Sequence, residues 1–353
     1  MNYFVIGYYA LLIGGSCLAA YYQQRTAFLL LFSLTLASFI MGIIGGEPAL
    51  WAVTVGAGVI ALAAGTSYAF REFLVIVLPT ELSKVVKTAP LTASFGIFVV
   101  LTYAIAGIFA PIIAPFGEAE IVSDAFAPAD ETMLLGADQL GRDMFSRLIY
   151  GARNSVGLAL VATAIAFFVG AVAGLIAATK GGWFDQIMGR AVDVIMSIPS
   201  IIFALLLLSI FGTSITTLVI VIGIIYAPRV FRLARAVAGN IVVMDYIEAA
   251  KLRGEGTWYL IRKEILPNST APLIAEFGLE FCFVFLLVAG LSFLGLGIQP
   301  PTADWGSMVR ENATLVSFGE ITPLIPAAAI ALLTVAVNFI VDWMLYRSSG
   351  LKE

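Results

Sequence analysis

Two carboxylates four residues apart are the side chains best placed to bind a proton or a cation. Glu276 and Glu280 lie in an apolar run, and their spacing puts them on one face of a helix. From a start near Pro272, Glu280 would lie about 12 Å along that helix, where an unpaired carboxylate in a membrane is costly. Two interpretations stay open: the pair faces an open path through the protein and disfavours anions there, or it bonds to another subunit.

Other chemistry has few side chains to work with. The sequence has no histidine, and it contains no G-x-x-x-x-G-K-[ST] phosphate loop, H-E-x-x-H, G-x-S-x-G or C-x-x-C motif. We therefore expect no catalytic residue, no metal site and no cofactor in this chain. Cys17 and Cys282 both fall in apolar runs, so we expect buried small hydrophobes rather than a disulfide.

The elements that position these residues are membrane helices. Of 353 residues, 61% are hydrophobic and 12% charged, and the mean hydropathy is +1.01. Apolar runs of about 20 residues recur along the chain, and in a bilayer such runs must be helical. An all-α polytopic membrane protein is therefore expected. The first run lacks the basic start of a signal peptide and is kept as a span. Nine spans are predicted, at 3–22, 26–45, 50–70, 91–113, 155–179, 191–211, 214–237, 271–296 and 322–346.

Charge asymmetry predicts the orientation. The loop between the seventh and eighth predicted spans is rich in Lys and Arg, whereas residues 114–141 hold six Asp and Glu and no Lys or Arg. By the positive-inside rule, the basic loop is cytoplasmic and the acidic segment lies outside. Counting spans back from these two segments places Arg25, Lys84 and Lys87 inside.

The basic loop, "DYIEAAKLRGEGTWYLIRKEILPN", predicts two short helices on the cytoplasmic face. Asp245 is expected to cap the first helix, and Gly254 to end it in the left-handed conformation. The second helix, 257–265, is expected to stop at Pro267. Glu248 can cap its own helix or pair with a basic partner, and the whole loop can also be a mere topology signal.

Four sequence blocks in register resemble one family of transporters. They are "EAA" with Gly254 and "ILP" in the basic loop, "LLGADQLGRDMFSRLIYGARNS" (134–155), "GGWFDQIMGRAVDVIMSIPS" (181–200) and "LSFLGLGIQPPTADWGSM" (291–308). Their order and spacing are similar to the C-type membrane subunit of dipeptide, oligopeptide and nickel ABC importer permeases. The resemblance implies a type I ABC importer fold of six core spans, here preceded by about three additional spans.

The resemblance also implies a division of the chain and a set of site residues. Residues 1–90 would be an N-terminal extension with an amphipathic connector at 71–87, residues 91–150 the first core span and an extracytoplasmic segment, and residues 151–346 the transmembrane domain, with the coupling loop at 245–267. The implied residues that couple to the ATPase are Tyr246, Glu248, Ala249, Ala250, Arg253 and Gly254. The Gly-rich segment that holds Ser292 is expected to pack helices closely and to line the translocation path, together with Glu276 and Glu280.

Implied partners are a second homologous permease subunit, two ABC ATPases or one fused ATPase that bind ATP and Mg, and an extracytoplasmic solute-binding protein. Membrane lipids are expected around the chain, which would reside in a bacterial or archaeal plasma membrane, and no nucleic acid is expected. The outer segment "GRDMFSRLIYGAR" predicts an interfacial amphipathic helix with Arg142, Arg147 and Arg153 on its polar side, or a docking surface for the binding protein. "LRGEG" and Glu264 depart from the family pattern. Two other classes stay open: an ion-coupled secondary transporter using Glu276 and Glu280, and a non-transporting scaffold.

Overall fold

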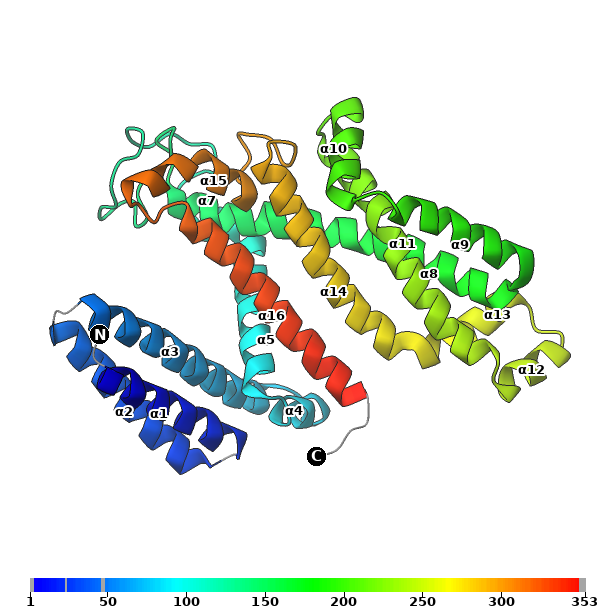
Figure 1. Cartoon of the computed structure of the whole chain (residues 1–353), viewed down its shortest axis with the longest axis horizontal. Coiled ribbons are helices and arrows are strands. Elements are labelled where there is room, and N and C mark those ends of the chain that lie inside the picture. Colours follow the sequence, from blue (N-terminus) through cyan, green and yellow to red (C-terminus); the bar gives the residue numbers. More distant parts are fainter. Residues whose placement is uncertain (1–2, 23, 46–47, 349–353) are drawn as a thin grey trace. The chain divides into compact units, whose positions relative to one another are not determined.

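The chain folds into α-helices arranged in two units. The computed structural model describes residues 3–22, 24–45 and 48–348, and these belong to the units Met1–Phe98 and Val99–Glu353 (Figure 1). Within the described residues, β pairing is limited to two isolated bridges in the outer segment, Ile121 with Arg142 and Ala137 with Asp143. The all-α prediction is confirmed.

The first unit is built from three long apolar helices and a short amphipathic one. They are α1 (Tyr3–Tyr21), α2 (Arg25–Gly45), α3 (Pro48–Val77) and the short α4 (Thr80–Lys87), and the start of α5 (Leu91–Ile108) follows them in the same unit. Helices α1 and α2 pack on each other, and both pack on α3. The predicted connector at 71–87 is two pieces, because residues 71–77 continue α3 and Pro79 starts a new helix. That helix folds back on α3, where the Ser83 hydroxyl donates to the Val75 carbonyl at 2.9 Å.

The second unit contains the remaining helices. In chain order they are α6 (Ala110–Ile113), α7 (Met144–Gly151), a π-helical turn (Ala152–Val156), α8 (Gly157–Lys180), α9 (Gly182–Met196), α10 (Ser200–Phe211), α11 (Ile215–Val242), α12 (Asp245–Leu252), α13 (Thr257–Tyr259), a second π-helical turn (Leu260–Ile265), α14 (Leu266–Phe293), α15 (Trp305–Glu311), a 3-10 helix (Ala313–Phe318) and α16 (Leu324–Ser348).

Six helical segments of the described residues are long and apolar enough to cross a membrane, or seven if one bent pair counts as a span. The bent pair is α9 and α10, which meet at 85°. The predicted span at 191–211 therefore contains a sharp bend, and the two helices can still be counted together as one span. Pro199 lies at the junction and cannot continue the hydrogen-bond ladder of α9, so the helix breaks there.

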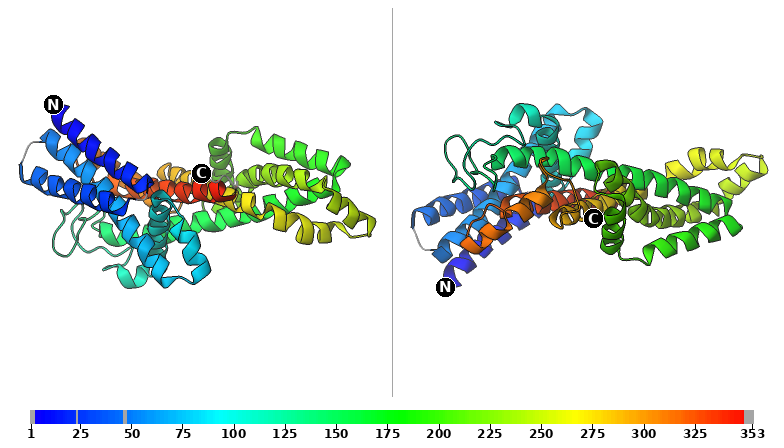
Figure 2. Two further views of the ribbon diagram at one scale, coloured as in Figure 1. Left: turned by 90° about the horizontal axis from the view of Figure 1, so that it is seen from below. Right: turned by 90° about the horizontal axis from the view of Figure 1, so that it is seen from above.

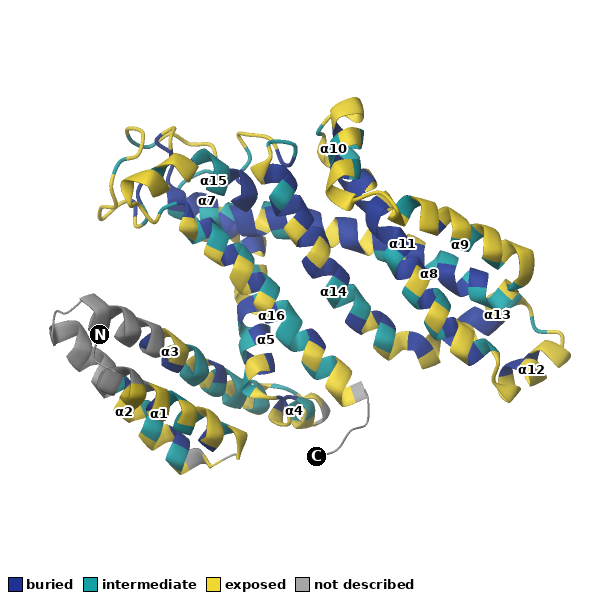
Figure 3. Cartoon of the chain, in the orientation of Figure 1, coloured by how far each residue is buried: buried dark blue, intermediate teal, exposed yellow. Residues whose placement is uncertain are grey.

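The core of the second unit lies between α8 and α11, which run side by side (Figure 2). Their close approach depends on Gly170 and Gly174, where a Cβ would overlap the backbone of Ala227 and Phe231 respectively. Further along, α14 packs against α16 and contributes buried Phe281 to the largest apolar cluster. Buried positions follow the contacts between these helices, while their outer faces carry exposed apolar residues (Figure 3). Such faces are typical of helices that contact lipid or other membrane subunits.

Candidate coupling and translocation sites

The basic loop forms the predicted elbow at one end of the second unit (Figures 1 and 2). Its first helix, α12, ends where Gly254 adopts a positive φ of 85°. The amide of Gly254 donates to the Lys251 carbonyl at 2.9 Å, and the amide of Glu255 donates to the Ala250 carbonyl at 3.2 Å. This pair of bonds is a Schellman stop, for which the left-handed conformation of glycine is suited.

The second arm of the elbow does not stop at Pro267, contrary to expectation. Helix α13, the π-helical turn and α14 form one continuous candidate span from Thr257 to Phe293. Pro267 lies in the first turn after the π-helical turn, at a position where the missing amide of proline interrupts little. Movement of the elbow would therefore be passed directly into a membrane helix.

The inner face of α12 is fixed to the chain's own core. Ile247 and Ala250 are both 0% exposed and join a cluster with Leu260, Ile261 and Ile265 of the second arm. The expectation that Ala250 is presented to a partner is wrong, because the second arm and α11 already cover this side of the helix. Ala250 is small enough to let α12 approach these elements closely.

The outer face of α12 is free of such contacts. Tyr246 is 43% exposed, and Ala249 and Arg253 are exposed beside it. Leu252, 85% exposed, also points away from the core, and sequence reasoning missed it. The signal that could have identified it is its place between Lys251 and Arg253, two residues expected in solvent. An aromatic, a leucine and a cation on one short helix suit protein docking.

The start of α12 differs from the predicted cap. The capping position is Met244, in extended conformation and with no side-chain cap, and Asp245 is the first helical residue. Glu248 is exposed and forms no capping bond, so the structure shows only its acidic charge in the first turn, which suits the positive end of the helix dipole.

The carboxylates of α14 lie in different surroundings. Glu280 is 1% exposed, and its Oε1 lies 3.2 Å from Nε of Arg229 on α11. The Arg229 guanidinium also lies 4.2 Å from the ring centroid of Phe283, while its side chain is 39% exposed. Glu276, one turn earlier, is half-buried. The structure therefore pairs Glu280 within the chain instead of exposing it to a path.

Ser292 is also enclosed by its own chain. It is 1% exposed, and its hydroxyl accepts a hydrogen bond from the Ile298 amide at 3.3 Å. Neighbouring Gly297 and Gly306 approach so closely that a Cβ on either would overlap Ser292. Ser292 thus closes the turn that follows α14, and it does not line a surface in this structure. Of the three residues expected along the path, Glu280 and Ser292 are buried, and only Glu276 is partly accessible.

The outer segment folds around a buried charge cluster. Nε of Arg142 donates to Asp138 Oδ2 at 2.7 Å, and Arg147 Nε lies 3.3 Å from the same oxygen. Both guanidiniums also donate to Glu311 of α15, at 3.1 and 3.3 Å. The predicted amphipathic helix with Arg142 and Arg147 on a polar outer side is wrong, because both side chains are at most 3% exposed and are paired with Asp138 and Glu311. The cluster joins the outer segment to α15.

Neither cysteine forms a disulfide. Both are free thiols; Cys282 is buried, as expected, whereas Cys17 is exposed. In the part of the chain that the structure describes, no three His, Cys, Asp or Glu side chains are grouped so as to hold a metal ion.

The helices, the elbow and the buried outer cluster define a multi-pass membrane component with a projecting loop. Residues 170–349 match the family model described as "Binding-protein-dependent transport system inner membrane component". This match covers half of the chain and includes α12 and α14, so the chain belongs to that family. It is a multi-pass protein of the plasma membrane.

Curated relatives are peptide permeases. The chain is 34% identical over 254 residues to the "Di/tripeptide transport system permease protein DppC" of Pseudomonas aeruginosa, an alignment that covers 70% of this chain and 84% of the relative. It is 35% identical over 257 residues to the "Probable D,D-dipeptide transport system permease protein DdpC" of Escherichia coli, covering 72% and 86%. It is also 34% identical over 211 residues to the "Glutathione transport system permease protein GsiD" of Pectobacterium atrosepticum, covering 59% and 69%. The chain is thus an ABC importer permease of the C type.

Proposed function

We propose that this chain forms one half of a heterodimeric pore that imports short peptides, with a second homologous permease subunit as the other half. The cargo class is supported by the relatives, which are named for di- and tripeptides, D,D-dipeptides and glutathione. An extracytoplasmic binding protein delivers the cargo, and two ATPase subunits, or one fused ATPase, bind ATP and Mg and hydrolyse ATP on the cytoplasmic side.

The elbow is the observation that carries this proposal. Its inner face is fixed by Ile247 and Ala250, and its outer face offers Tyr246, Leu252 and Arg253 to a partner. A docking helix that transmits motion must be rigid on one side and exposed on the other, and α12 has both properties. Because α12 packs on the second arm, and that arm continues into α14, a displacement of α12 would reach the membrane helix through these packed side chains.

The translocation path is proposed to include Glu276, and Glu280 acts on it indirectly. Arg229 and Glu280 together are neutral, so Glu276 leaves the group with one net negative charge. Ser292 contributes by holding the turn after α14 in place. Such a group would weakly disfavour anionic cargo near the middle of the bilayer.

Transport by the complete complex in proteoliposomes tests the proposal. Vesicles containing this permease, its partner permease and the ATPases encoded beside it are given binding protein and a labelled dipeptide. Uptake should require ATP on the side of the membrane where the ATPase subunits lie. It should persist when the proton gradient is collapsed with an uncoupler. Uptake that follows the proton gradient while ATP is held constant would instead identify a secondary transporter. Intact assembly with no uptake under either condition would identify a scaffold.

A further inference from the structure

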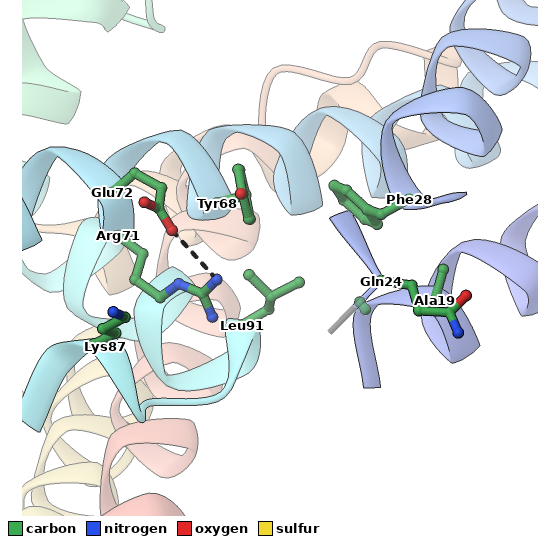
Figure 4. Close-up of a pocket in the computed structure, with 9 residues that line it drawn as sticks. Ala19, Gln24, Phe28, Tyr68, Arg71, Glu72, Lys87 and Leu91 are labelled. Atoms are coloured by element: carbon green, nitrogen blue, oxygen red, sulfur yellow. Dashed lines mark ion pairs between the residues drawn. The ribbon is translucent and has the colours of Figure 1, made fainter. Parts of the chain in front are cut away.

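The N-terminal unit contains a pocket that is separate from the elbow and from the α14 carboxylates described above. Three segments of Met1–Phe98 surround it: the end of α1 and start of α2, the last third of α3, and the junction of α4 with α5 (Figure 4). Its polar lining residues are Gln24, Tyr68, Arg71, Glu72 and Lys87, and its apolar ones are Ala19, Ala20, Phe28 and Leu91.

Arg71 is held so that its guanidinium lies in this pocket. It stacks 5.2 Å from the ring centroid of Tyr68, its Nη1 donates to the Ala89 carbonyl at 3.3 Å, and its Nη2 lies 3.7 Å from Glu72. These contacts fix the plane of the group while leaving several of its five N–H donors unused. Lys87 stands beside it (Figure 4), exposed and without an ion-pair partner among the described residues.

The charge and size of the pocket select a small anion. Two cations and one carboxylate line it, which leaves one net positive charge. Its volume of about 80 Å³ admits a phosphate-sized group, whereas pockets for drug-sized or peptide-sized ligands are roughly 300–1,000 Å³. A planar guanidinium next to an ammonium is a recurrent arrangement for binding phosphate oxygens.

The surroundings of the pocket favour a lipid as the source of that phosphate. The span count places this end of the unit at the cytoplasmic surface, where anionic lipids concentrate. Exposed apolar side chains flank the pocket on the end of α1, the end of α3 and α4: they are Tyr21, Tyr22, Phe73, Ile76, Val77 and Leu82. Acyl chains can cover such residues, while a free anion in water cannot.

We propose that this pocket binds the phosphate of an anionic phospholipid of the cytoplasmic leaflet, with Arg71 and Lys87 as its ligands and Tyr68 holding Arg71. The bound lipid would anchor the N-terminal unit at the membrane surface. The proposal is independent of the cargo and of the coupling loop, so no outcome of the transport experiment decides it.

Native mass spectrometry of the purified full-length chain tests this proposal. The chain in detergent is titrated with palmitoyl-oleoyl phosphatidylglycerol or, separately, with palmitoyl-oleoyl phosphatidylcholine. We expect a first phosphatidylglycerol adduct at several-fold lower lipid concentration than the first phosphatidylcholine adduct. This preference should fall several-fold in Lys87→Gln and disappear in Arg71→Gln/Lys87→Gln. Lys87 is exposed, so its substitution leaves the fold intact, and Arg71→Lys should retain part of the preference.

Lys84→Gln is the matched control, because Lys84 lies on the same helix but does not line the pocket. Equal losses in Lys84→Gln and Lys87→Gln would show attraction by overall charge alone and overturn the site. Equal binding of the two lipids by the natural chain would overturn it as well. Displacement of phosphatidylglycerol by millimolar inorganic phosphate would assign the pocket to a free anion and overturn the lipid source.

Discussion

Arg229 of α11 and Glu280 of α14 form an ion pair, with Nε 3.2 Å from Oε1, between two helices that both qualify as membrane spans. The pair gives one oxygen of a buried carboxylate a charged partner, and the guanidinium lies against the ring of Phe283. Removing the charge of Glu280 therefore leaves Arg229 without its counterion in an apolar region, whereas removing the charge of Glu276 does not.

We expect Glu280→Gln to destabilise the permease by about 1–3 kcal/mol, because a charged partner loses its bond, and Glu276→Gln to have a smaller effect. Thermal unfolding of the two purified variants, followed by scanning fluorimetry, measures the difference. In the assembled transporter, Glu276→Gln should instead lower uptake of a lysine-containing dipeptide relative to an aspartate-containing one. Equal unfolding temperatures for the two variants would remove the structural role given to the Arg229 pair.

Ala250 lies on the covered face of α12, and Leu252 lies on its exposed face. An aspartate at Ala250 places a charge among Ile247 and Leu260, which costs several kcal/mol unless the elbow unfolds locally. An aspartate at Leu252 lies on the exposed face and leaves the fold alone. We expect Ala250→Asp to increase protease cleavage near residues 245–265, and Leu252→Asp to leave cleavage unchanged while reducing copurification of the ATPase. Unchanged ATPase recovery with Leu252→Asp would show that the docking surface lies elsewhere.

The sequence predicted the helical class, most spans and both arms of the elbow, because apolar length, Gly254 and the basic residues are local signals. It could not predict which face of α12 is covered, since Ala249 and Ala250 are identical residues in adjacent positions. It also predicted Arg147 on an exposed polar face, because its partner in the buried cluster, Glu311, is 164 residues away in the chain.

The buried outer cluster predicts a large stability effect. Asp138→Asn leaves two guanidiniums facing a single carboxylate, and removal of one partner from a buried ion pair costs about 3–5 kcal/mol. Asp124→Asn in the same segment is the matched control, since Asp124 is exposed. Thermal unfolding and the yield of folded protein compare the two. A shift for Asp138→Asn no larger than that of the control would mean that the cluster adds nothing to the stability of the outer segment.

Cysteine labelling tests the orientation on which the lipid site depends. Glu131 and Gly256 are both exposed and belong to the outer segment and the elbow. Glu131 is preferred to Asp130, whose pKa is held below its usual range by hydrogen bonds from the Thr132 hydroxyl and nearby amides, so that its loss would loosen the turn. In a chain with Cys17 and Cys282 replaced by serine, a membrane-impermeant maleimide should label position 131 in intact cells and position 256 only after lysis. Labelling of both positions in intact cells would refute the orientation.

Gly254 and Gly256 form a matched pair for testing the coupling function. A valine at Gly254 must adopt a φ near +85°, at a cost of about 1–2 kcal/mol or more for a β-branched residue, although nothing crowds the added Cβ. Gly256 has a φ of −78° and an extended ψ of 163°, a conformation that valine readily adopts, and its Cβ also meets open space. We therefore expect Gly254→Val to insert normally, because the apolar spans direct insertion, but to reduce both peptide uptake and ATP hydrolysis stimulated by the binding protein. Gly256→Val should retain most of both activities. If the two variants lose activity equally, the effect comes from bulk on the elbow rather than from the helix stop; if both stay fully active, the elbow is a topology signal and the coupling function assigned to α12 is wrong.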